Sequence, residues 1–357
     1  MLGAARAIFG PGADSMMVKM RIVVALAAAA SGVACKKAPA KAKALAMAPT
    51  VAWTATDLGI GRCVATNAKG QILGVDDANQ TFVVTADGTR STLPGAGDAL
   101  TIGTGIDDQG VVFGYSETAT GRSAVRYTSG AWAAIPQLGS FSAAIAASGD
   151  GAVVGVTRTS DGSALQGFLF ASEALATIPL PTDRSSIAQA AAPGGLVAGV
   201  IEAATGESHA FRIVKGTLEE LGTLGGVSSS ALAISANGDT VGSAEATTGE
   251  RHAFFCAAGS RVLVDLGLPQ SATNSDARGI DAKGRIAGNA DFADGSTHPF
   301  IFVQGAAAID LLPRNSATGP YSSAHAAAIA ADGRVVGWGV AKGAGSIAHC
   351  LSWTPGS

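Results

Sequence analysis

Residues 209–242 read HAFRIVKGTLEELGTLGGVSSSALAISANGDTVG, and this stretch contains the local signals from which the architecture can be predicted. Ser235 and Gly238 occupy the first and fourth positions of a predicted type I turn, in which the glycine takes the left-handed conformation. Gly242 follows four residues after Gly238, with the β-branched Thr240 between them, as a strand would have it. The segment therefore predicts a tight β-hairpin.

The same pair of glycines recurs along the chain, which identifies an internal repeat. The seven pairs are Gly70/Gly74, Gly110/Gly114, Gly151/Gly155, Gly195/Gly199, Gly238/Gly242, Gly284/Gly288 and Gly333/Gly337. Successive first glycines are 40 to 49 residues apart, the period of a four-stranded propeller blade. Seven residues before each first glycine stands a small residue: Cys63, Gly103, Ala144, Ala188, Ala231, Ala277 and Ala326. This position is expected to face a crowded region, such as the strand nearest a central axis.

Two further strands complete each repeat. The third strand is clearest at His209–Phe211, His252–Phe254 and His298–Phe300, and the fourth at Leu221–Gly226, Asp265–Gly267 and Asp310–Leu312. The last repeat stops after its third strand, His349–Trp353, whereas Trp53–Gly59 supplies a fourth strand at the other end of the chain. The sequence predicts an all-β fold, a seven-bladed β-propeller of four-stranded antiparallel blades, closed by the N-terminal strand completing the last blade.

The order of these motifs resembles a known family. A His-Ala-Phe strand, a Leu-Gly-Thr-Leu-Gly-Gly segment and an Ala-x-x-Ile-x-x-x-Gly-x-x-x-Gly hairpin are similar to the HAF-repeat proteins, a family of predicted extracellular bacterial repeats. His209–Gly242 carries the pattern almost in full, and weaker copies cover the rest of the repeat region. The first three repeats lack the histidine. The resemblance implies an extracellular repeat protein and no particular activity.

The first 35 residues have the pattern of a secretory signal peptide. Lys19 and Arg21 precede the apolar stretch 22–30, which runs into small residues. Residues before Met17 fit no part of this pattern, so Met17 or Met20 is the better start for such a peptide. The chain is therefore expected to be exported, to the periplasm, the outer membrane or the cell exterior.

Cys35 lies where a bacterial lipoprotein carries its lipidated cysteine, and residues 1–35 are predicted to be a signal peptide of that type. Ordinary cleavage nearby is the alternative, because Gly32 stands where such sequences usually have a large aliphatic residue. Residues 36–50 are rich in Lys, Ala and Pro and are predicted to be a flexible tether. Residues 51–357 then form the propeller, expected to be a monomer that meets the membrane only through the lipid on Cys35.

Composition excludes several classes of function. With 24 Lys+Arg against 27 Asp+Glu, the chain has no positive field to neutralise the phosphates of nucleic acid. Outside the N-terminus no apolar run approaches the roughly 20 residues of a membrane-spanning helix. Walker, Gly-x-Ser-x-Gly and His-Glu-x-x-His motifs are absent from the sequence, and no cofactor is predicted.

Two registers of polar residues invite a metal hypothesis. His209, His252, His298 and His349 occupy matching positions in four repeats. Equivalent atoms of adjacent blades should lie on the order of 10 Å apart, whereas zinc ligands lie about 2 Å from the metal, so we predict structural histidines that hydrogen-bond to a neighbouring blade's backbone. The acids Asp77, Glu117, Glu202, Glu245 and Asp291 form the second register. They are interpreted as solvated strand ends, with cation attraction or pairing with Arg122 or Arg251 as alternatives.

The three cysteines beyond Cys35 leave two interpretations open. Cys63 and Cys350 belong to the first and last repeats, which adjoin in a closed ring, so a disulfide between them is conceivable. Their positions lie on different strands of the blade, which favours burial as small apolar residues instead. Cys256 is the third cysteine.

An insertion gives the best pointer to a binding surface. The connection before the last repeat is longer than its counterparts and contains Arg314, Asn315, Tyr321 and His325, and insertions in repeat arrays tend to mark the binding face. Few aromatic residues are present, which favours a protein partner over a glycan. We expect a non-catalytic binding or scaffolding module of the cell envelope. The alternative is an envelope enzyme, a glycan or peptide lyase or hydrolase, with its site at the central mouth.

Overall fold

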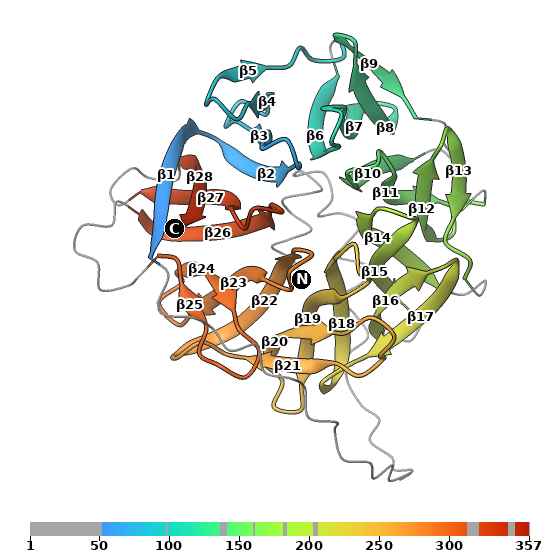
Figure 1. Ribbon diagram of the computed structural model, residues 1–357. Coiled ribbons are helices and arrows are strands. Elements are labelled where there is room, and N and C mark those ends of the chain that lie inside the picture. The colour runs from blue at the N-terminus through green and yellow to red at the C-terminus, as the bar shows by residue number, and fades with distance from the viewer. Residues whose placement is uncertain are drawn as a thin grey trace. The chain divides into compact units, whose positions relative to one another are not determined.

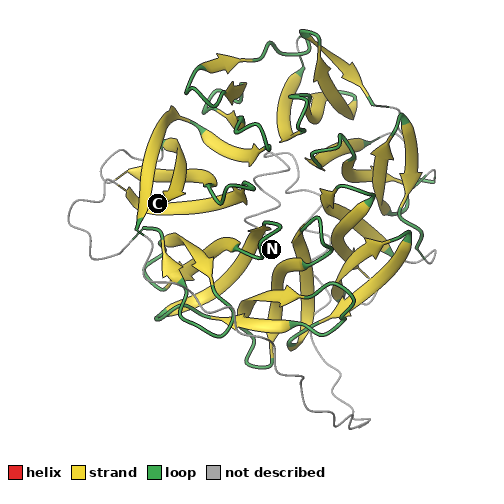
Figure 2. Cartoon of the chain, viewed as in Figure 1, coloured by secondary structure: helices red, strands yellow, loops and turns green. Residues whose placement is uncertain are grey.

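The computed structural model describes residues 52–97, 99–135, 141–159, 161–180, 184–202, 206–312, 321–341 and 347–356. These residues all belong to the second of the two compact units into which the chain divides, the one that begins at residue 45. They form 28 strands and no helix (Figure 2). The cysteine Cys35 and the predicted tether lie outside the described residues.

Seven four-stranded groups, here called blades 1 to 7, follow the sequence repeats. Their strands are, for blade 1, β2 (Arg62–Thr66), β3 (Ile72–Val75), β4 (Thr81–Val84) and β5 (Arg90–Thr92); for blade 2, β6 (Leu100–Ile106), β7 (Val112–Thr118), β8 (Gly121–Thr128) and β9 (Ala131–Ala134); for blade 3, β10 (Ser142–Ala147), β11 (Val153–Arg158), β12 (Leu165–Ala171) and β13 (Ala174–Thr177); for blade 4, β14 (Ser185–Ala192), β15 (Leu196–Glu202), β16 (Ser208–Val214) and β17 (Thr217–Gly222); for blade 5, β18 (Gly225–Ile234), β19 (Thr240–Ala246), β20 (Arg251–Cys256) and β21 (Val264–Gly267); for blade 6, β22 (Ala272–Ile280), β23 (Ile286–Phe292), β24 (Thr297–Phe302) and β25 (Ile309–Asp310); and for blade 7, β26 (Tyr321–Ile329), β27 (Val335–Ala341), β28 (Ala348–Pro355) and β1 (Trp53–Ile60).

Within each blade, neighbouring strands are antiparallel, and in blades 1 to 6 they follow one another in chain order from the first strand to the fourth. The first strands surround the centre of the ring and the fourth strands form its rim (Figure 1). A single parallel bridge between Ser208 and Ser228 connects blades 4 and 5. The predicted seven-bladed, all-β propeller is confirmed.

Blade 7 takes strands from both ends of the chain. The blue β1 lies beside the red β28 in Figure 1, and the two pair in antiparallel register from Trp53 opposite Pro355 to Ile60 opposite His349. The predicted closure by the N-terminal strand is therefore correct. β1 is thus the fourth strand of the sheet that β26, β27 and β28 form.

The hairpin between the first and second strands has the predicted turn. In blade 5 the Gly238 N–H donates to the Ser235 carbonyl at 2.9 Å, and Gly238 has φ of 88°. A β-bulge interrupts the first strand just after the small residue, between Ala231 and Ala233. The same bulge recurs in all seven blades.

The core lies between blades, where small and apolar side chains pack sheet against sheet. Ala231, Ala244 and Phe254 of blade 5 are buried with Ala210 and Leu221 of blade 4. The small residue seven before each first glycine is buried in every blade, as expected for a crowded position. Its packing explains why none of these residues is larger than cysteine.

Candidate functional site

The hairpin turns that connect first and second strands are tied to one another around the ring. The Asn67 side chain donates to the Asp107 carbonyl at 2.7 Å, and the Asn237 side chain donates to the Ala282 carbonyl at 3.1 Å. The Arg285 guanidinium donates to the Ala331 carbonyl at 3.1 Å in the same way. We call this side the hairpin face. Because its polar groups are used within the ring, the side where first strands begin, here the opposite face, is the better place to look for a ligand.

One cross-strand pair of the repeat is apolar in three neighbouring blades and contains a polar side chain in the other four. It pairs the residue eight before each first glycine, on the first strand, with a cross-strand partner on the second. In blades 2, 3 and 4 these pairs are apolar: Ile102 with Tyr115, Ala143 with Val156 and Ile187 with Val200. In blades 5, 6, 7 and 1 they are Ser230 with Ser243, Asp276 with Asn289, His325 with Trp338 and Arg62 with Val75. The polar side chains at this repeat position therefore lie in four consecutive blades, which form one continuous arc of the ring.

Blade 6 places a buried ion pair in this arc. Arg278 is the bulged residue of β22, and it donates to Asp276 from Nε to Oδ1 at 3.0 Å and from Nη2 to Oδ2 at 2.9 Å. Asn289 donates to Oδ1 of the same carboxylate at 3.2 Å. Burial opposes the ionisation of Asp276, but the charge and hydrogen bonds of Arg278 outweigh it and hold the pKa of Asp276 below its ordinary value. The charged carboxylate thus fixes the Arg278 guanidinium.

The Asn289 side chain also joins blade 6 to blade 7. Its Oδ1 accepts from the Ala326 N–H at 2.7 Å, and its Nδ2 donates to the Ala326 carbonyl at 3.2 Å. Both backbone groups of a buried residue beside the bulge of β26 are satisfied in this way. The inner strands of the two blades are held in fixed register at the site.

Blade 7 contributes a stack of two rings. His325 lies on Trp338 with ring centroids 4.0 Å apart and planes inclined by 22°, and the Arg62 guanidinium carbon lies 5.2 Å from the centroid of the Trp338 ring. Burial lowers the pKa of His325 to about 4, against the pull of Asp276 and Asp291. The imidazole is therefore uncharged at neutral pH.

We call Arg62, Asp276, Arg278, Asn289, His325 and Trp338 the inner-strand cluster. Arg278 and Arg62 both act on the charge of His325, as do Asp276 and Asp291. Asp291 stands at the end of β23 that lies on the opposite face, and Arg62 is the first residue of β2. The cluster therefore extends from the middle of the inner strands toward the opposite face.

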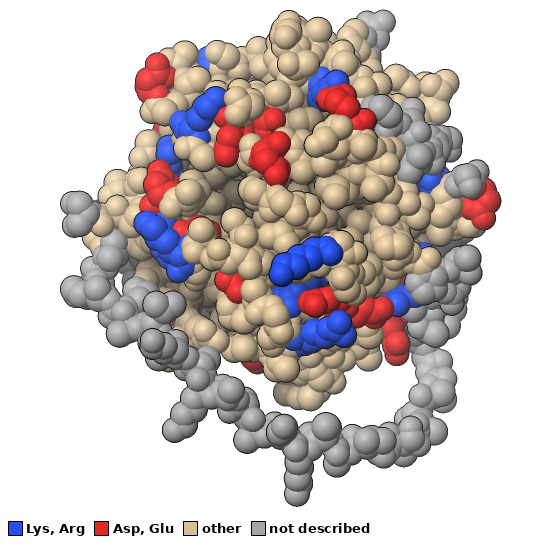
Figure 3. Space-filling model, turned by 45° about the vertical axis from the view of Figure 1, so that its right-hand side comes forward, with Lys and Arg blue, Asp and Glu red and all other residues tan. Residues whose placement is uncertain are grey.

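Members of the acidic register pair with arginines where one is near. Arg122 donates to Glu117 at 2.5 Å, and Arg251 lies 3.6 Å from Asp291. Small groups of acidic and basic side chains stand next to one another in the view of Figure 3. The alternative of arginine pairing holds at these two positions.

The four predicted binding residues do not come together in one described site. Tyr321 is buried at the start of β26, and its hydroxyl donates to Asp57 of β1 at 2.8 Å, so it serves the closure of blade 7. His325 belongs to the inner-strand cluster. Arg314 and Asn315 lie outside the described residues.

The repeat histidines pair with acids and not with a neighbouring blade's backbone, so that expectation was wrong. The Nδ1–carboxylate distances are 3.5 Å for His209 with Glu220, 2.9 Å for His252 with Asp265, 2.9 Å for His298 with Asp310 and 2.8 Å for His349 with Asp57. Each acid is on the fourth strand of the same blade. Serines make the contact between blades instead: the Ala210 N–H donates to Ser229 at 2.8 Å and the Ala253 N–H to Ser275 at 2.9 Å.

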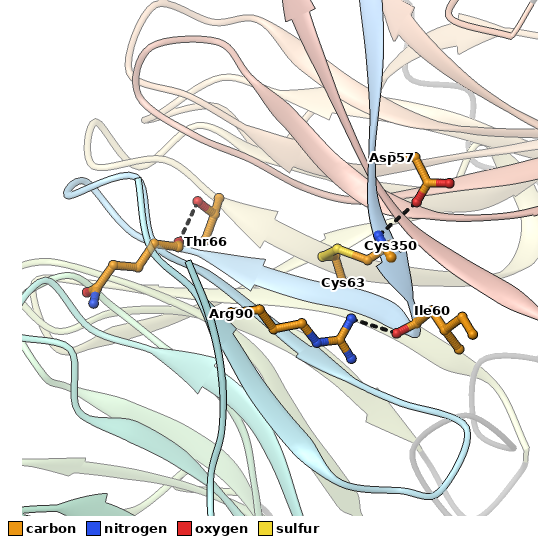
Figure 4. The surroundings of a disulfide bond; sticks show 8 residues. Asp57, Ile60, Cys63, Thr66, Arg90 and Cys350 are labelled. Atoms are coloured by element: carbon orange, nitrogen blue, oxygen red, sulfur yellow. Dashed lines mark hydrogen bonds between the residues drawn. A yellow bond between two sulfur atoms is a disulfide. The ribbon is translucent and has the colours of Figure 1, made fainter. Parts of the chain in front are cut away.

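Cys63 and Cys350 form a disulfide, which corrects the preference for two buried thiols. Their Cα atoms are 4.9 Å apart where β2 passes β28 (Figure 4), within the range such bonds require. Both residues are also fully buried. Cys256 is free and buried, and burial raises the pKa of its thiol, so it is an unreactive residue of the core.

Two other kinds of feature are absent from the described ranges. No three His, Cys, Asp or Glu side chains there are grouped so that they could hold a metal ion. That part of the chain also contains no helix with the length and apolar character needed to cross a membrane.

Sequence reasoning missed most of the inner-strand cluster. It identified the small residue seven before each first glycine but did not compare the residue before it. That comparison gives Arg62, Ile102, Ala143, Ile187, Ser230, Asp276 and His325. The change from apolar to polar residues in consecutive repeats is the signal that would have found the site.

Comparison with known proteins finds similarity of fold but not of sequence. No family model matches the chain, and no curated protein matches it in sequence. Among solved structures, the β-propeller domain of the Trilobed protease from Pyrococcus furiosus, described as having an open velcro topology, is 11% identical with a TM-score of 0.56 over 84% of this chain and 94% of that one. A prolyl endopeptidase is 9% identical with a TM-score of 0.57 over 84% of this chain, which spans 50% of that protein. YCF48, solved with a D1 peptide, is 12% identical with a TM-score of 0.50 over 88% of this chain and 97% of that one. These likenesses show that the chain is similar to β-propellers.

Proposed function

We propose that this chain is an exported, lipid-anchored propeller that binds a protein partner through the opposite face of blades 5, 6, 7 and 1. The observation that carries the proposal is the register in which three blades keep apolar pairs while the adjoining four have polar or charged ones. A repeat fold needs no such departure for stability, because the apolar pairs of blades 2 to 4 pack well. Polar groups confined to one arc indicate a recognition surface.

The exported location has support from two separate parts of the chain. The pattern of residues 19–35 is that of a signal peptide, and Cys35 is the proposed site of lipid attachment. The disulfide between Cys63 and Cys350 suits an oxidising compartment. Membership of the HAF-repeat family is part of the same proposal. Labelling with a fatty-acid analogue, compared between the wild type and Cys35→Ala, tests the anchor, which is rejected if the variant keeps the label.

We propose a protein and not a glycan as the partner because other side chains already cover the aromatic ring of this face. Trp338 already contacts His325 and Arg62, so its ring offers little open face for a sugar. YCF48, a protein of similar fold, was solved with a peptide bound. An extended segment of a partner protein is the ligand that we propose.

Site-specific photocrosslinking tests the binding surface. A photoreactive amino acid is placed at Thr273 or Ser322, which are exposed at the starts of β22 and β26, and at Lys283, exposed on the hairpin face of blade 6. We expect one discrete protein adduct in native envelopes from Thr273 and Ser322, and none from Lys283. Adducts from Lys283 alone, or no adduct from any position, would refute the proposed face. Turnover of a peptide or glycan library by the purified protein would refute a purely binding role.

A further inference from the structure

We propose that the inner-strand cluster binds a carboxylate carried by an acidic peptide segment, with Arg62 and the outer side of Arg278 as its anchors. This inference names the ligand of the proposed binding face and rests on that function. Nothing in the fold itself requires these charges, because the corresponding positions of blades 2 to 4 carry Ile102, Ala143 and Ile187.

The charge balance of the cluster favours an anion. Asp276 is neutralised by Arg278, and the His325 imidazole carries no charge at neutral pH. Arg62 is exposed and forms no ion pair with any described residue. Asp291 is paired with Arg251, whose nitrogen lies 3.6 Å from its carboxylate, so the charge of Arg62 is the one that remains unbalanced at the site, although the chain as a whole has a formal net charge of -3.

The geometry of Arg278 leaves part of its guanidinium for a ligand. Its two bonds to Asp276 use Nε and Nη2, so Nη1 takes part in no hydrogen bond within the described ranges. The side chain is 32% exposed, on the bulge of an inner strand. A guanidinium held by a buried acid is preorganised to donate to a second carboxylate without losing side-chain freedom.

A single carboxylate fits this balance better than a polyanion. One uncompensated arginine on an acidic protein does not supply the field that a nucleic acid or a polyphosphate requires. In the adjoining blade, Ser230 and Ser243 are the cross-strand pair of the same register, and the Ser230 hydroxyl accepts a hydrogen bond from the Gln189 side chain at 3.2 Å. Hydroxyls donate and accept, as the backbone amides of an extended peptide require.

The test uses a labelled peptide of alternating Glu and Ala residues, and a matched peptide of Gln and Ala. Fluorescence anisotropy with the full exported chain should show at least tenfold tighter binding of the Glu peptide. Arg62→Ala should weaken that binding about tenfold, equivalent to about 1.4 kcal/mol. Arg62→Lys should lie between the two, because it keeps the charge without the planar fork.

Arg126→Ala is the matched control. Arg126 is a partly exposed arginine on β8, the third strand of blade 2, and it pairs with Glu173 in the turn between β12 and β13, so its removal should leave peptide affinity unchanged. Equal binding of the Glu and Gln peptides, no binding of either, or an equal loss in Arg126→Ala would overturn the carboxylate proposal. Displacement by an oligogalacturonate with no binding of the Glu peptide would assign the site to an acidic glycan and overturn it as well.

The two proposals fail in different ways. If the Glu peptide does not bind but Thr273 still crosslinks to one envelope protein, the carboxylate ligand is wrong and the binding face stands. If neither experiment gives a signal, both are wrong.

Discussion

At the scale of single residues, one position of the repeat has side chains of very different polarity from blade to blade. His325 takes the place that Ile187 has in blade 4, and it is stacked on a tryptophan between two arginines and two acids. Because the imidazole is held where water is scarce, the structure favours its uncharged form. That preference makes the folding free energy depend on pH.

We predict that His325 destabilises the fold in acid. The unfolded chain binds a proton at this residue below its ordinary pKa of 6.5, whereas the folded protein resists until about 4. The contribution of His325 to the free energy of unfolding is therefore fully present above pH 6.5, and it falls by roughly 2–3 kcal/mol as the pH approaches 4. His325→Phe keeps a ring on Trp338 and has no proton to bind.

The measurement is urea unfolding of both proteins at pH 7 and pH 4. The free energy of unfolding should fall less for His325→Phe than for the wild type, by about that amount. Equal falls in the two proteins would show that His325 is already solvated.

At the scale of elements, the two glycines of each hairpin have different reasons to be there. The first has a positive φ, as Gly238 does at 88°. In blades 2 to 7 the second is needed because the bulged inner strand presents a carbonyl to it: a Cβ at Gly242 would lie 2.0 Å from the Ser230 oxygen. The bulge and the second glycine therefore belong to one local structure.

Gly242→Ala should destabilise the protein by about 3 kcal/mol, since the backbone of two paired strands must separate to admit a methyl group. Gly95→Ala is the control. A Cβ there meets no atom closer than 3.6 Å, and its φ is not in the left-handed region, so its stability should change by less than about 1 kcal/mol. Chemical denaturation of both variants measures the difference, and similar effects would exclude the clash as the cause.

The hairpins, the blade period and the closing strand could all be predicted from the sequence, because a sevenfold repeat shows each local signal seven times. The histidine partners could not be predicted from one repeat. Comparison of blades explains them: the acids Glu220, Asp265, Asp310 and Asp57 occur in the blades that have a histidine, whereas blades 1 to 3 have Thr92, Ala134 and Thr177 at the acid position. The two motifs change together because their side chains touch.

The preference for two buried thiols is wrong for a reason of packing between blades. It rests on the positions of Cys63 and Cys350 on different strands of the blade. In the ring, however, the third strand of one blade lies against the first strand of the next, as the bond from Ala253 of β20 to Ser275 of β22 shows. Cys350 of β28 and Cys63 of β2 have this same relation, so their different strands are what brings them together.

At the scale of the whole ring, the closure is secured by strand pairing, by further hydrogen bonds and by a disulfide. Besides the pairing of β1 with β28, the Gly61 N–H donates to the Ala348 carbonyl at 2.8 Å, and Gly356 donates to Ala52 at 2.6 Å. Asp57 accepts from Gly59, Tyr321 and His349, and these hydrogen bonds outweigh burial and lower the pKa of Asp57. The disulfide adds a covalent link to the same junction.

Reduction of this disulfide should lower the stability of the ring by about 2–5 kcal/mol, because the bond closes a loop with a sequence separation of 287 residues in the unfolded chain. Urea midpoints of the wild type with and without a thiol reductant measure the loss. The double variant Cys63→Ala/Cys350→Ala should resemble the reduced protein and be insensitive to the reductant. A reduced wild type as stable as the oxidised one would show that strand pairing alone closes the ring.

The origin of blade 7 in both ends of the chain also has a consequence for the order of events during synthesis. Among the described strands, β1 is synthesised first and its partner β28 last, so blade 7 cannot be completed until β28 has been made. Until that moment the growing chain is an open arc with two exposed sheet edges, and this is the interval in which it is most vulnerable to wrong pairing with another copy.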